Sequence, residues 1–418
     1  MPACKDKYYW CKDEPSVCRD GDGMRYCVFH APKGKKGVSL EDFNKKIFAK
    51  IGKAQMERNE CDLSWTIFEG DISFWHYDKT NPLPEINFFF ATFNGEANFW
   101  EVIFSGEANF NNATFSGEAW FSDTTFGEEA DFFGVTFSGE ANFSDATFSK
   151  KADFSLAKFN GGAYFRGNGI DADRKGVFKK GAKFNRFSVK EKIIFEGVNL
   201  EEVSFLDSDL RKADFINCEW PKKDYRWLPS FIAYRIRPEY RRNVLYDENE
   251  LFNKRNSKEN KIDEGEIKKV GVLYRMLKQK YVDDHDWPEV SNWHYGEKEM
   301  YRKGSRFRRF FPLSISNLYW LFGGYGERPV RAGAWLWVFI VAVAGLMWWL
   351  GFAPADNLNY ESSVGAYFLN ALQYVTFYKD PIFKPTSLWG ETVALFARVV
   401  IPLQAALFVL AVRNRFRR

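Results

Sequence analysis

Phenylalanine recurs at two alternating spacings along residues 88–165, and this regularity restricts the fold more than any other feature of the sequence. Successive Phe residues are separated by five and then six positions, without a break. An α-helix has a period of 3.6 residues and cannot produce this pattern, which excludes a helix for the segment. The positions are Phe88, Phe93, Phe99, Phe104, Phe110, Phe115, Phe121, Phe126, Phe132, Phe137, Phe143, Phe148, Phe154, Phe159 and Phe165.

The repeating unit is eleven residues long, as in FSGEANFSDAT at residues 137–147. A long array of short units that each bury one large and one small apolar residue predicts a solenoid. We expect each Phe to stack on its equivalent one coil away, at about 4.8 Å along the axis, with polar residues at the turns. An alanine, expected in the next inward position, precedes every second Phe by two residues: Ala97, Ala108, Ala119, Ala130, Ala141, Ala152 and Ala163.

The pattern extends in both directions, so we place the solenoid at residues 59–220. Insertions interrupt it at 75–87 and after Ile170, and its last part tightens to steps of five residues. The further core positions are Leu63, Phe68, Phe74, Phe178, Phe184, Val189, Phe195, Leu200, Phe205, Leu210 and Phe215. About 27 core positions predict six to seven coils and an axis of roughly 30 Å.

Several of these units resemble the pentapeptide-repeat family, whose unit is A-(D/N)-(L/F)-x-x. The matching segments include Ala141-Asn142-Phe143, Ala152-Asp153-Phe154, Val203-Ser204-Phe205, Ser208-Asp209-Leu210 and Ala213-Asp214-Phe215. The resemblance implies a right-handed quadrilateral β-helix. The alternation of five and six departs from the family's strict period, so we expect one extra, bulged residue on every second side.

Charge favours no single class of partner. The chain has 59 Lys and Arg against 55 Asp and Glu, a net charge of +4, which is too balanced to indicate a nucleic-acid-binding protein. Residues 86–165 are acidic, with eleven acidic and three basic side chains. Some members of the family imitate DNA, and this acidity is compatible with such mimicry. The stronger interpretation is that the acidic turns solvate the solenoid and prevent aggregation at its edges.

Four of the six cysteines lie within the first 27 residues, and a histidine follows closely. The N-terminus has no apolar segment typical of a signal peptide, so we expect a reducing cytoplasm, where clustered cysteines more often bind metal than form disulfides. Zinc requires four ligands, and five candidates are present in this module of residues 1–58: Cys4, Cys11, Cys18, Cys27 and His30. The alternative is a set of reduced thiols without metal.

Helical patterning replaces the repeat from residue 221 to residue 330. Residues 264–281 carry apolar side chains at helical spacing: Ile267, Val270, Leu273, Tyr274, Leu277 and Tyr281. The following aromatic group is interpreted as the packed face of a helix pair, with a ligand pocket as the alternative: Trp293, His294, Tyr295, Met300 and Tyr301. A basic run beside aromatic residues then predicts an amphipathic segment on the cytoplasmic membrane face: Arg302, Lys303, Arg306, Arg308 and Arg309.

Residues 331–418 have the composition of a membrane domain. Residues 332–355 contain no charge, and apolar spans are predicted at about 333–353 and 388–412. Tryptophans near the ends of the first span are typical of an aromatic belt. Arg331 precedes the first span, and the second is followed by Arg413, Arg415, Arg417 and Arg418. The positive-inside rule then predicts that both termini are cytoplasmic and that the connecting loop lies outside.

The connecting loop contains a short apolar helix, predicted over Ala366 to Val375, which is too short to span a bilayer. This order of span, short helix and span resembles the two-helix tetrameric ion-channel domain, and implies a re-entrant pore loop at 362–384. The resemblance places the candidate filter residues at Thr376, Phe377, Tyr378, Lys379 and Asp380. No glycine lies between Gly365 and Gly390, which argues against a potassium filter. An interfacial helix on the outer leaflet is the alternative.

The second span contains four candidate pore or gating residues: Glu391, Arg398, Pro402 and Gln404. A charge inside a span is costly, which makes Arg398 a functional candidate, either paired with Glu391 or facing the pore. Pro402 would remove one helix hydrogen bond and permit a kink. Gln404 would line the pore, or alternatively bond to a neighbouring helix.

The whole layout resembles bacterial pentapeptide-repeat proteins that end in an ion-channel-like domain. The likeness rests on residues 274–278, 325–331 and 402–418. It implies an oligomeric channel, with a tetramer favoured, in the bacterial inner membrane. Lipid, ions and an unidentified cytoplasmic protein or ligand would be its partners, and nucleic acid is not expected. The alternative is a membrane-anchored scaffold without conduction. No catalytic constellation is recognisable, so an enzyme is not expected.

Overall fold

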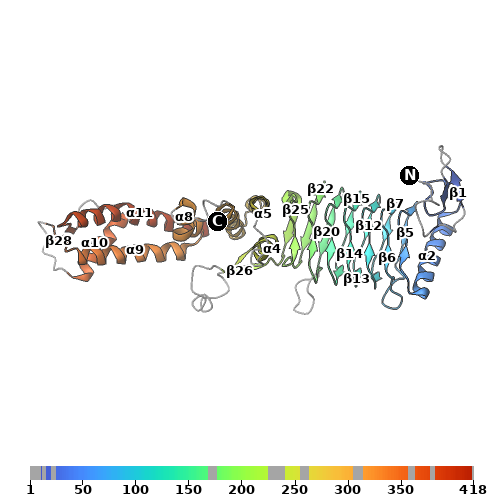
Figure 1. Cartoon of the computed structure of the whole chain (residues 1–418), viewed down its shortest axis with the longest axis horizontal. Helices are drawn as coiled ribbons and strands as arrows, with labels where there is room; N and C mark the ends of the chain where they lie inside the picture. The colour runs from blue at the N-terminus through green and yellow to red at the C-terminus, as the bar shows by residue number, and fades with distance from the viewer. Residues whose placement is uncertain are drawn as a thin grey trace. The chain divides into compact units, whose positions relative to one another are not determined.

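The computed structural model of the chain describes residues 11, 16–19, 25–167, 177–224, 241–254, 263–304, 314–355, 363–376 and 382–416. The chain divides into two compact units (Figure 1). Unit 1 comprises Met1–Asp224 and Arg241–Ile262, and unit 2 comprises Tyr225–Tyr240 and Asp263–Arg418. Candidate filter residues 377–380, the basic residues Arg306, Arg308 and Arg309, and Cys4 lie outside the described residues.

Unit 1 is a β-solenoid of about seven coils, whose described strands form four parallel sheets. Each strand pairs with the equivalent strand of the next coil, which gives the stacked strands of Figure 1. One seven-stranded sheet contains, in spatial order, β24 (Val203–Ser204), β21 (Ala182–Lys183), β18 (Ala152–Asp153), β14 (Ala130–Asp131), β10 (Ala108–Asn109), β6 (Ile86–Asn87) and β3 (Cys61–Asp62). The other contains β25 (Ala213–Ile216), β23 (Ile193–Glu196), β20 (Ala163–Arg166), β16 (Ala141–Asn142), β12 (Ala119–Trp120), β8 (Ala97–Asn98) and β5 (Ile72–Ser73).

The remaining two sheets of the solenoid are shorter. The six-stranded sheet contains β22 (Ser188–Val189), β19 (Lys158–Phe159), β15 (Thr136–Phe137), β11 (Thr114–Phe115), β7 (Thr92–Phe93) and β4 (Ile67–Phe68). The three-stranded sheet contains β17 (Thr147–Phe148), β13 (Thr125–Phe126) and β9 (Ile103–Phe104). Isolated bridges from Leu83 to Phe104 and from Phe148 to Phe178 continue this sheet past the two insertions.

The predicted stacking of phenylalanines is confirmed. Phe121 is fully buried, and its ring lies 4.8 Å from that of Phe99 in one neighbouring coil and 4.8 Å from that of Phe143 in the other, nearly parallel to both. All seven repeat alanines are also buried, as expected of the small inward position. Large and small residues thus alternate around an interior in which the phenylalanines of the central coils stack on one another.

The Asn or Asp of each unit has a specific structural role. Asn98 Oδ1 accepts a hydrogen bond from the backbone N–H of Trp100 at 2.9 Å, and Asp153 Oδ1 accepts one from Ser155 at 2.9 Å. The same side-chain cap recurs at Asp62, Asn87, Asn109, Asp131, Asn142 and Asn199. These side chains stabilise the turn that follows each strand, which explains why the unit contains Asn or Asp next to the inward alanine.

The bulge expected on every second side stays a prediction, because coils that share the same extra residue pair in register with or without it. None of the described solenoid strand pairs has a register shift. Connections of three and four residues alternate between the strands, and the three-residue one, as in Ser138–Gly139–Glu140, contains a column of glycines that allows neighbouring coils to approach. A Cβ added to Gly139 would lie 2.6 Å from the carbonyl oxygen of Gly117, and one added to Gly117 would lie 2.6 Å from that of Gly95. The handedness of the coil stays a prediction.

An N-terminal module covers the first coil of the solenoid. It consists of the antiparallel strands β1 (Ser16–Arg19) and β2 (Arg25–Cys27) and the helix α2 (Leu40–Glu57). The Ser39 side chain caps α2 by accepting a hydrogen bond from the N–H of Asp42. Its buried face, Phe43, Ile47, Ile51 and Ala54, packs toward the solenoid, and the Phe43 ring lies 6.0 Å from that of Phe68. This helix was not predicted from the sequence.

A second module covers the last coil. It follows η2 (Leu210–Lys212) and consists of β26 (Lys222–Asp224), β27 (Arg241–Asn243) and α4 (Tyr246–Lys254). Asp247 accepts hydrogen bonds from the Ser204 hydroxyl and the Phe205 N–H of the last coil. Burial raises the pKa of this carboxyl to about 6, although both hydrogen bonds oppose the shift. Both ends of the solenoid are therefore covered, as repeat arrays require.

In unit 2, the predicted helix pair is confirmed. Helix α5 (Glu264–Asp283) buries Ile267, Val270, Leu273, Tyr274 and Leu277, and packs against α6 (Trp287–Lys303). Trp293 is fully buried between the two helices. The helices approach closely at Gly296, because a Cβ there would lie 2.3 Å from the ring of Tyr274.

The rest of unit 2 is built on two apolar helices, α9 (Pro329–Trp349) and α11 (Leu388–Arg415). Preceding them are α8 (Ile315–Gly323) and η4 (Gly324–Gly326); between them lie β28 (Ala353–Pro354), α10 (Val364–Gln373), η5 (Tyr374–Thr376) and β29 (Phe383–Lys384). The first apolar helix starts and ends four residues earlier than the predicted span. Its start is explained by Pro329, because the fixed φ of proline favours the first turn of a helix. The short helix expected between the spans is present as α10.

Candidate functional site

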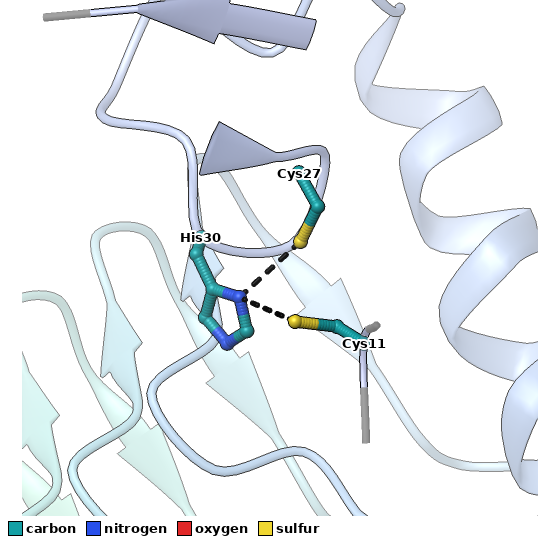
Figure 2. Close-up of side chains that lie close together, drawn as sticks. All are labelled: Cys11, Cys27 and His30. Carbon is teal, nitrogen blue, oxygen red and sulfur yellow. Dashed lines mark hydrogen bonds between the residues drawn. The ribbon is translucent and has the colours of Figure 1, made fainter. Parts of the chain in front are cut away.

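The N-terminal module brings together three of the five predicted metal ligands. The sulfur of Cys27 lies 3.2 Å from Nδ1 of His30, and that of Cys11 lies 3.5 Å from the same nitrogen. The three ligand atoms lie within 4.8 Å of one another, as Figure 2 shows. All three side chains are at most 3% exposed. This is a compact group of soft and borderline donor atoms in a closed interior.

A backbone contact fixes the orientation of the His30 ring. Nε2 lies 3.1 Å from the carbonyl oxygen of Ser64, and a carbonyl oxygen can only accept, so Nε2 carries the proton. The lone pair of a neutral imidazole is then on Nδ1, which faces the two sulfurs. Metal-binding histidines have this same arrangement, with the second nitrogen donating to a carbonyl or carboxylate. Ser64 belongs to the first coil and was not predicted, because a backbone acceptor leaves no signal in the sequence.

A buried lysine lies beside the cluster. Lys36 Nζ donates hydrogen bonds to the carbonyl oxygens of Val28 at 2.6 Å and Phe29 at 3.1 Å, and lies 4.3 Å from the centre of the Phe43 ring. Burial lowers the pKa of Lys36 to about 8, while the charges of Glu69, Cys27 and Cys18 oppose that shift. Cys18, in β1, is half-buried and is not one of the three clustered ligands.

The second candidate region is the packing of α9, α10 and α11. Its buried core contains Ile340, Val343 and Met347 of α9, Tyr367 and Ala371 of α10, and Ala394, Ala397 and Ile401 of α11. Polar contacts hold α10 at both of its ends. The Tyr367 hydroxyl donates to the carbonyl of Phe352 at 3.0 Å, and the Asn370 side chain accepts from the N–H of Phe383 at 3.2 Å. Tyr374, after the last turn of α10, is buried in the same core, and η5 packs against α11.

The predicted pore residues occupy different environments. Glu391 and Arg398 are both exposed on the chain, and among the described residues they form no ion pair with each other. Pro402 is buried within a continuous α11. The Gln404 amide donates to the carbonyls of Phe322 at 3.0 Å and Ala332 at 2.8 Å, which corresponds to the helix–helix alternative. Thr376 is exposed, and its hydroxyl donates to the Gln373 carbonyl.

The described part of the predicted basic run is paired inside unit 2. Arg302 and Lys303 lie 2.8 and 3.0 Å from the carboxylate of Glu299, and the Arg302 guanidinium lies 4.6 Å from the centre of the Trp320 ring. These two residues are thus paired within unit 2, and the membrane-facing position of the basic run stays a prediction. The spacing of three and four residues from Glu299 was visible in the sequence and predicts such pairs on one helix face.

Glu299 is a central polar residue that the sequence did not identify. It is 6% exposed and also accepts a hydrogen bond from the Tyr325 hydroxyl at 2.9 Å, which joins α6 to η4. Burial on its own would raise the pKa of this carboxyl, but Lys303 and Arg302 outweigh burial and lower the pKa to about 2. Tyr325 lies 26 positions away with no spacing rule connecting the two, so only the fold reveals this contact.

Comparison with known proteins identifies the repeats. The family model described as "Pentapeptide repeats (9 copies)" matches residues 88–136 and 132–167. The fold therefore defines a β-solenoid protein with pentapeptide repeats in its central coils. Neither the curated proteins nor the solved structures that were compared gave a match to the chain. The residues that match the family model all lie in the solenoid, and none lies in unit 2.

Proposed function

We propose that this protein is an integral membrane protein in which α9 and α11 cross the bilayer and, with α10, form the pore of an oligomeric ion channel. A tetramer is favoured, because two helices of one chain cannot enclose a pore. The solenoid and the helix pair would form its cytoplasmic part, which assembles or gates the pore in response to a protein or ligand. Lipid and ions would be the other partners, and no catalysis or nucleic-acid binding is proposed.

The exposed surface of the two apolar helices supports a membrane location. Both are long and apolar enough to cross a membrane, yet only about a third of the most apolar stretch of each is buried within the chain. Exposed side chains include Trp337, Val341 and Trp349 on α9 and Leu395, Val399 and Leu403 on α11. A core helix of a soluble protein would bury most of such a surface, whereas lipid or another subunit would cover it in a bilayer.

The observation that carries the pore proposal is that Tyr374, in η5 directly after α10, lies in one buried core with Ala397 of α11, the residue before Arg398. Arg398 lies ten residues into α11, which corresponds to about 15 Å along the helix, or about half the thickness of the hydrocarbon core. The end of α10 therefore reaches the middle of the apolar stretch. A short helix that enters to this depth and returns is expected where protein or a water-filled pore shields its backbone.

The exposure of Arg398 supports oligomerisation. A guanidinium near the middle of a bilayer is costly in lipid and normally faces a bundle interior or a water-filled cavity. In the single chain, Arg398 is on the surface. A ring of these side chains around a pore would repel cations and favour anions. The positive-inside rule supports cytoplasmic termini, and the resemblance to bacterial proteins of this layout points to the inner membrane.

A membrane-anchored scaffold is the second candidate. The observation in its favour is that the Gln404 amide, an expected pore-lining group, is bonded within the chain. In this case α9 and α11 would be an anchor, and the solenoid would bind a cytoplasmic protein without any conduction.

The test is reconstitution of the full-length protein into liposomes, with its mass measured in detergent. We expect an oligomer that gives discrete currents, and Arg398→Gln should shift the reversal potential toward cation permeability or disrupt the oligomer. Arg413→Gln removes the same charge beyond the apolar stretch and should leave both properties unchanged. A monomeric mass with no flux would exclude the channel and favour the scaffold.

A further inference from the structure

We propose that Cys11, Cys27 and His30 bind a divalent cation of the zinc class, and that the bound ion fastens the N-terminal module to the first coil of the solenoid. The ligand atoms are the two Sγ atoms and Nδ1 of the histidine. This inference goes beyond the proposed membrane function, because it involves residues of unit 1 alone and holds for either a channel or a scaffold.

The distances agree with tetrahedral coordination. A zinc ion with Zn–S of about 2.3 Å and Zn–N of about 2.0–2.1 Å separates its sulfur and nitrogen ligands by about 3.5 Å. The two observed separations from Nδ1 are 3.2 and 3.5 Å. The three donor atoms point toward one another in Figure 2; Cys27 is the last residue of β2, and His30 lies in the turn that follows it.

The imidazole has the tautomer that metal binding requires. Because Nε2 donates to the Ser64 carbonyl, Nδ1 presents its lone pair to Cys11 and Cys27. A cation placed among the three atoms satisfies the nitrogen and both sulfurs together, and the carbonyl then acts as the outer partner that holds the ring.

Charge balance favours a divalent ion in this interior. Two thiolates and a neutral imidazole around a 2+ ion give a net charge of zero, which suits side chains that are at most 3% exposed. Soft thiolate and borderline imidazole donors select zinc over magnesium or calcium, which prefer oxygen ligands. Cys18 is the candidate for the fourth ligand, because β1 pairs it with Tyr26, next to Cys27. Its thiolate would give the centre a net charge of 1−, which the ammonium of Lys36, bonded to the Val28 and Phe29 carbonyls, would balance.

The site lies where the module meets the solenoid. The segment that carries the ligands bonds to the first coil twice, through His30 Nε2 to the Ser64 carbonyl and through the Ile67 N–H to the Phe29 carbonyl at 2.9 Å. Phe29 also packs on Phe43 of α2, which packs on Phe68 of the solenoid. A metal that fixes this segment therefore stabilises the cover of the first coil, which a repeat array needs to protect its open end.

The first experiment measures metal in the full-length protein purified under reducing conditions. We expect one equivalent of zinc per chain, and replacement by Co²⁺ should give thiolate-to-cobalt charge transfer and the visible bands of a tetrahedral site. Cys11→Ser and Cys27→Ser should lose these bands, and Cys18→Ser should lose them if it supplies the fourth ligand. Cys61→Ser and Cys218→Ser are matched controls outside the cluster and should keep the bands.

The second experiment tests the fastening by hydrogen exchange with and without a zinc chelator. Removing the metal should speed exchange of the Ile67 amide and of residues 25–36, while the coils around Phe121 stay protected. A well-folded protein that binds no metal, cobalt bands that survive Cys27→Ser, or a disulfide between Cys11 and Cys27 in the reduced preparation would each overturn the proposal. Unchanged exchange at Ile67 on metal removal would exclude the fastening role.

Discussion

Phe121 in the solenoid and Glu299 in the helical unit are both almost fully buried, but different kinds of contact hold them. Phe121 stacks on Phe99 and Phe143, which occupy the same position in the neighbouring coils, and this contact recurs along the array. Glu299 accepts hydrogen bonds from Tyr325 and Arg302, which occupy no equivalent positions in a repeat. The solenoid is thus stabilised by many equivalent stacking contacts. In unit 2, individual polar residues join particular helices beside the apolar core.

Sequence separation shows the same difference. The solenoid stacks residues that are about one coil of 22 residues apart, so each coil depends chiefly on its neighbours. In unit 2, Gln404 bonds to a carbonyl 82 positions away, and the Asn414 amide donates to the carbonyl of Gly326, 88 positions away. Damage to a coil should therefore remain local, whereas loss of one polar contact in unit 2 should loosen whole helices against each other.

The largest expected effect is that of Phe121→Ala in the central coils. Removing a ring that is in contact on both sides leaves a cavity, and such substitutions cost about 3–5 kcal/mol. Native-state hydrogen exchange should show faster exchange in the coils of Phe99 and Phe143, with unit 2 unchanged. Trp100→Ala is the control, because this aromatic residue is 47% exposed and its loss should change stability by about 0.5 kcal/mol or less. Equal effects of the two substitutions would contradict the stacking account.

The next effect is that of Glu299→Gln, which leaves Arg302 and Lys303 without their carboxylate. The folded-state pKa of about 2 lies below the ordinary value of 4.5, so the carboxylate contributes on the order of 3 kcal/mol above pH 4.5. That contribution is lost as the pH falls from 4.5 toward 2. Thermal unfolding of the full chain at pH 7 should show destabilisation of unit 2 in the variant.

The pH dependence sharpens this prediction. The stability difference between the wild type and Glu299→Gln should shrink as the pH falls through this range, because protonation has already neutralised the wild-type carboxyl. Glu264→Gln, at an exposed position in the first turn of α5, should change stability by about 0.5 kcal/mol or less at every pH. A difference that is independent of pH would indicate that the paired charge is not the cause.

The smallest expected change in stability comes from replacing glycines of unit 1, where Gly139 lies against a neighbouring coil and Gly52 faces open space. Gly139→Ala should cost about 1–3 kcal/mol, since its Cβ would lie 2.6 Å from the Gly117 carbonyl oxygen and force two coils apart. Gly52→Ala in α2 places a methyl group in open space and should stabilise the helix by about 0.5–1 kcal/mol. Chemical denaturation would measure both, and a stabilised Gly139→Ala variant would refute the close approach of the coils.

The sequence showed which residues could be ligands of the candidate metal site, but not which of them come together. Cys11, Cys27 and His30 were predicted together with Cys4 and Cys18, because spacing alone cannot decide which side chains converge. The backbone acceptor at Ser64 and the buried Lys36 were not predicted, since neither belongs to a spacing pattern. Helix α2 could have been found from Ser39, a capping residue, followed by apolar residues at helical spacing.

The sequence by itself determined the parts of this protein that repeat or that meet a uniform environment. The phenylalanine period specified the stacked coils, because every unit packs the same residue types in the same way. The two apolar stretches specified two long apolar helices, because length and composition suffice for that. Only the tertiary structure decided where the end of α10 packs against α11, that Gln404 bonds inside the chain, and that His30 faces two sulfurs. These contacts join residues far apart in the chain, and their energies depend on the distance and direction between individual polar atoms, which no local pattern encodes.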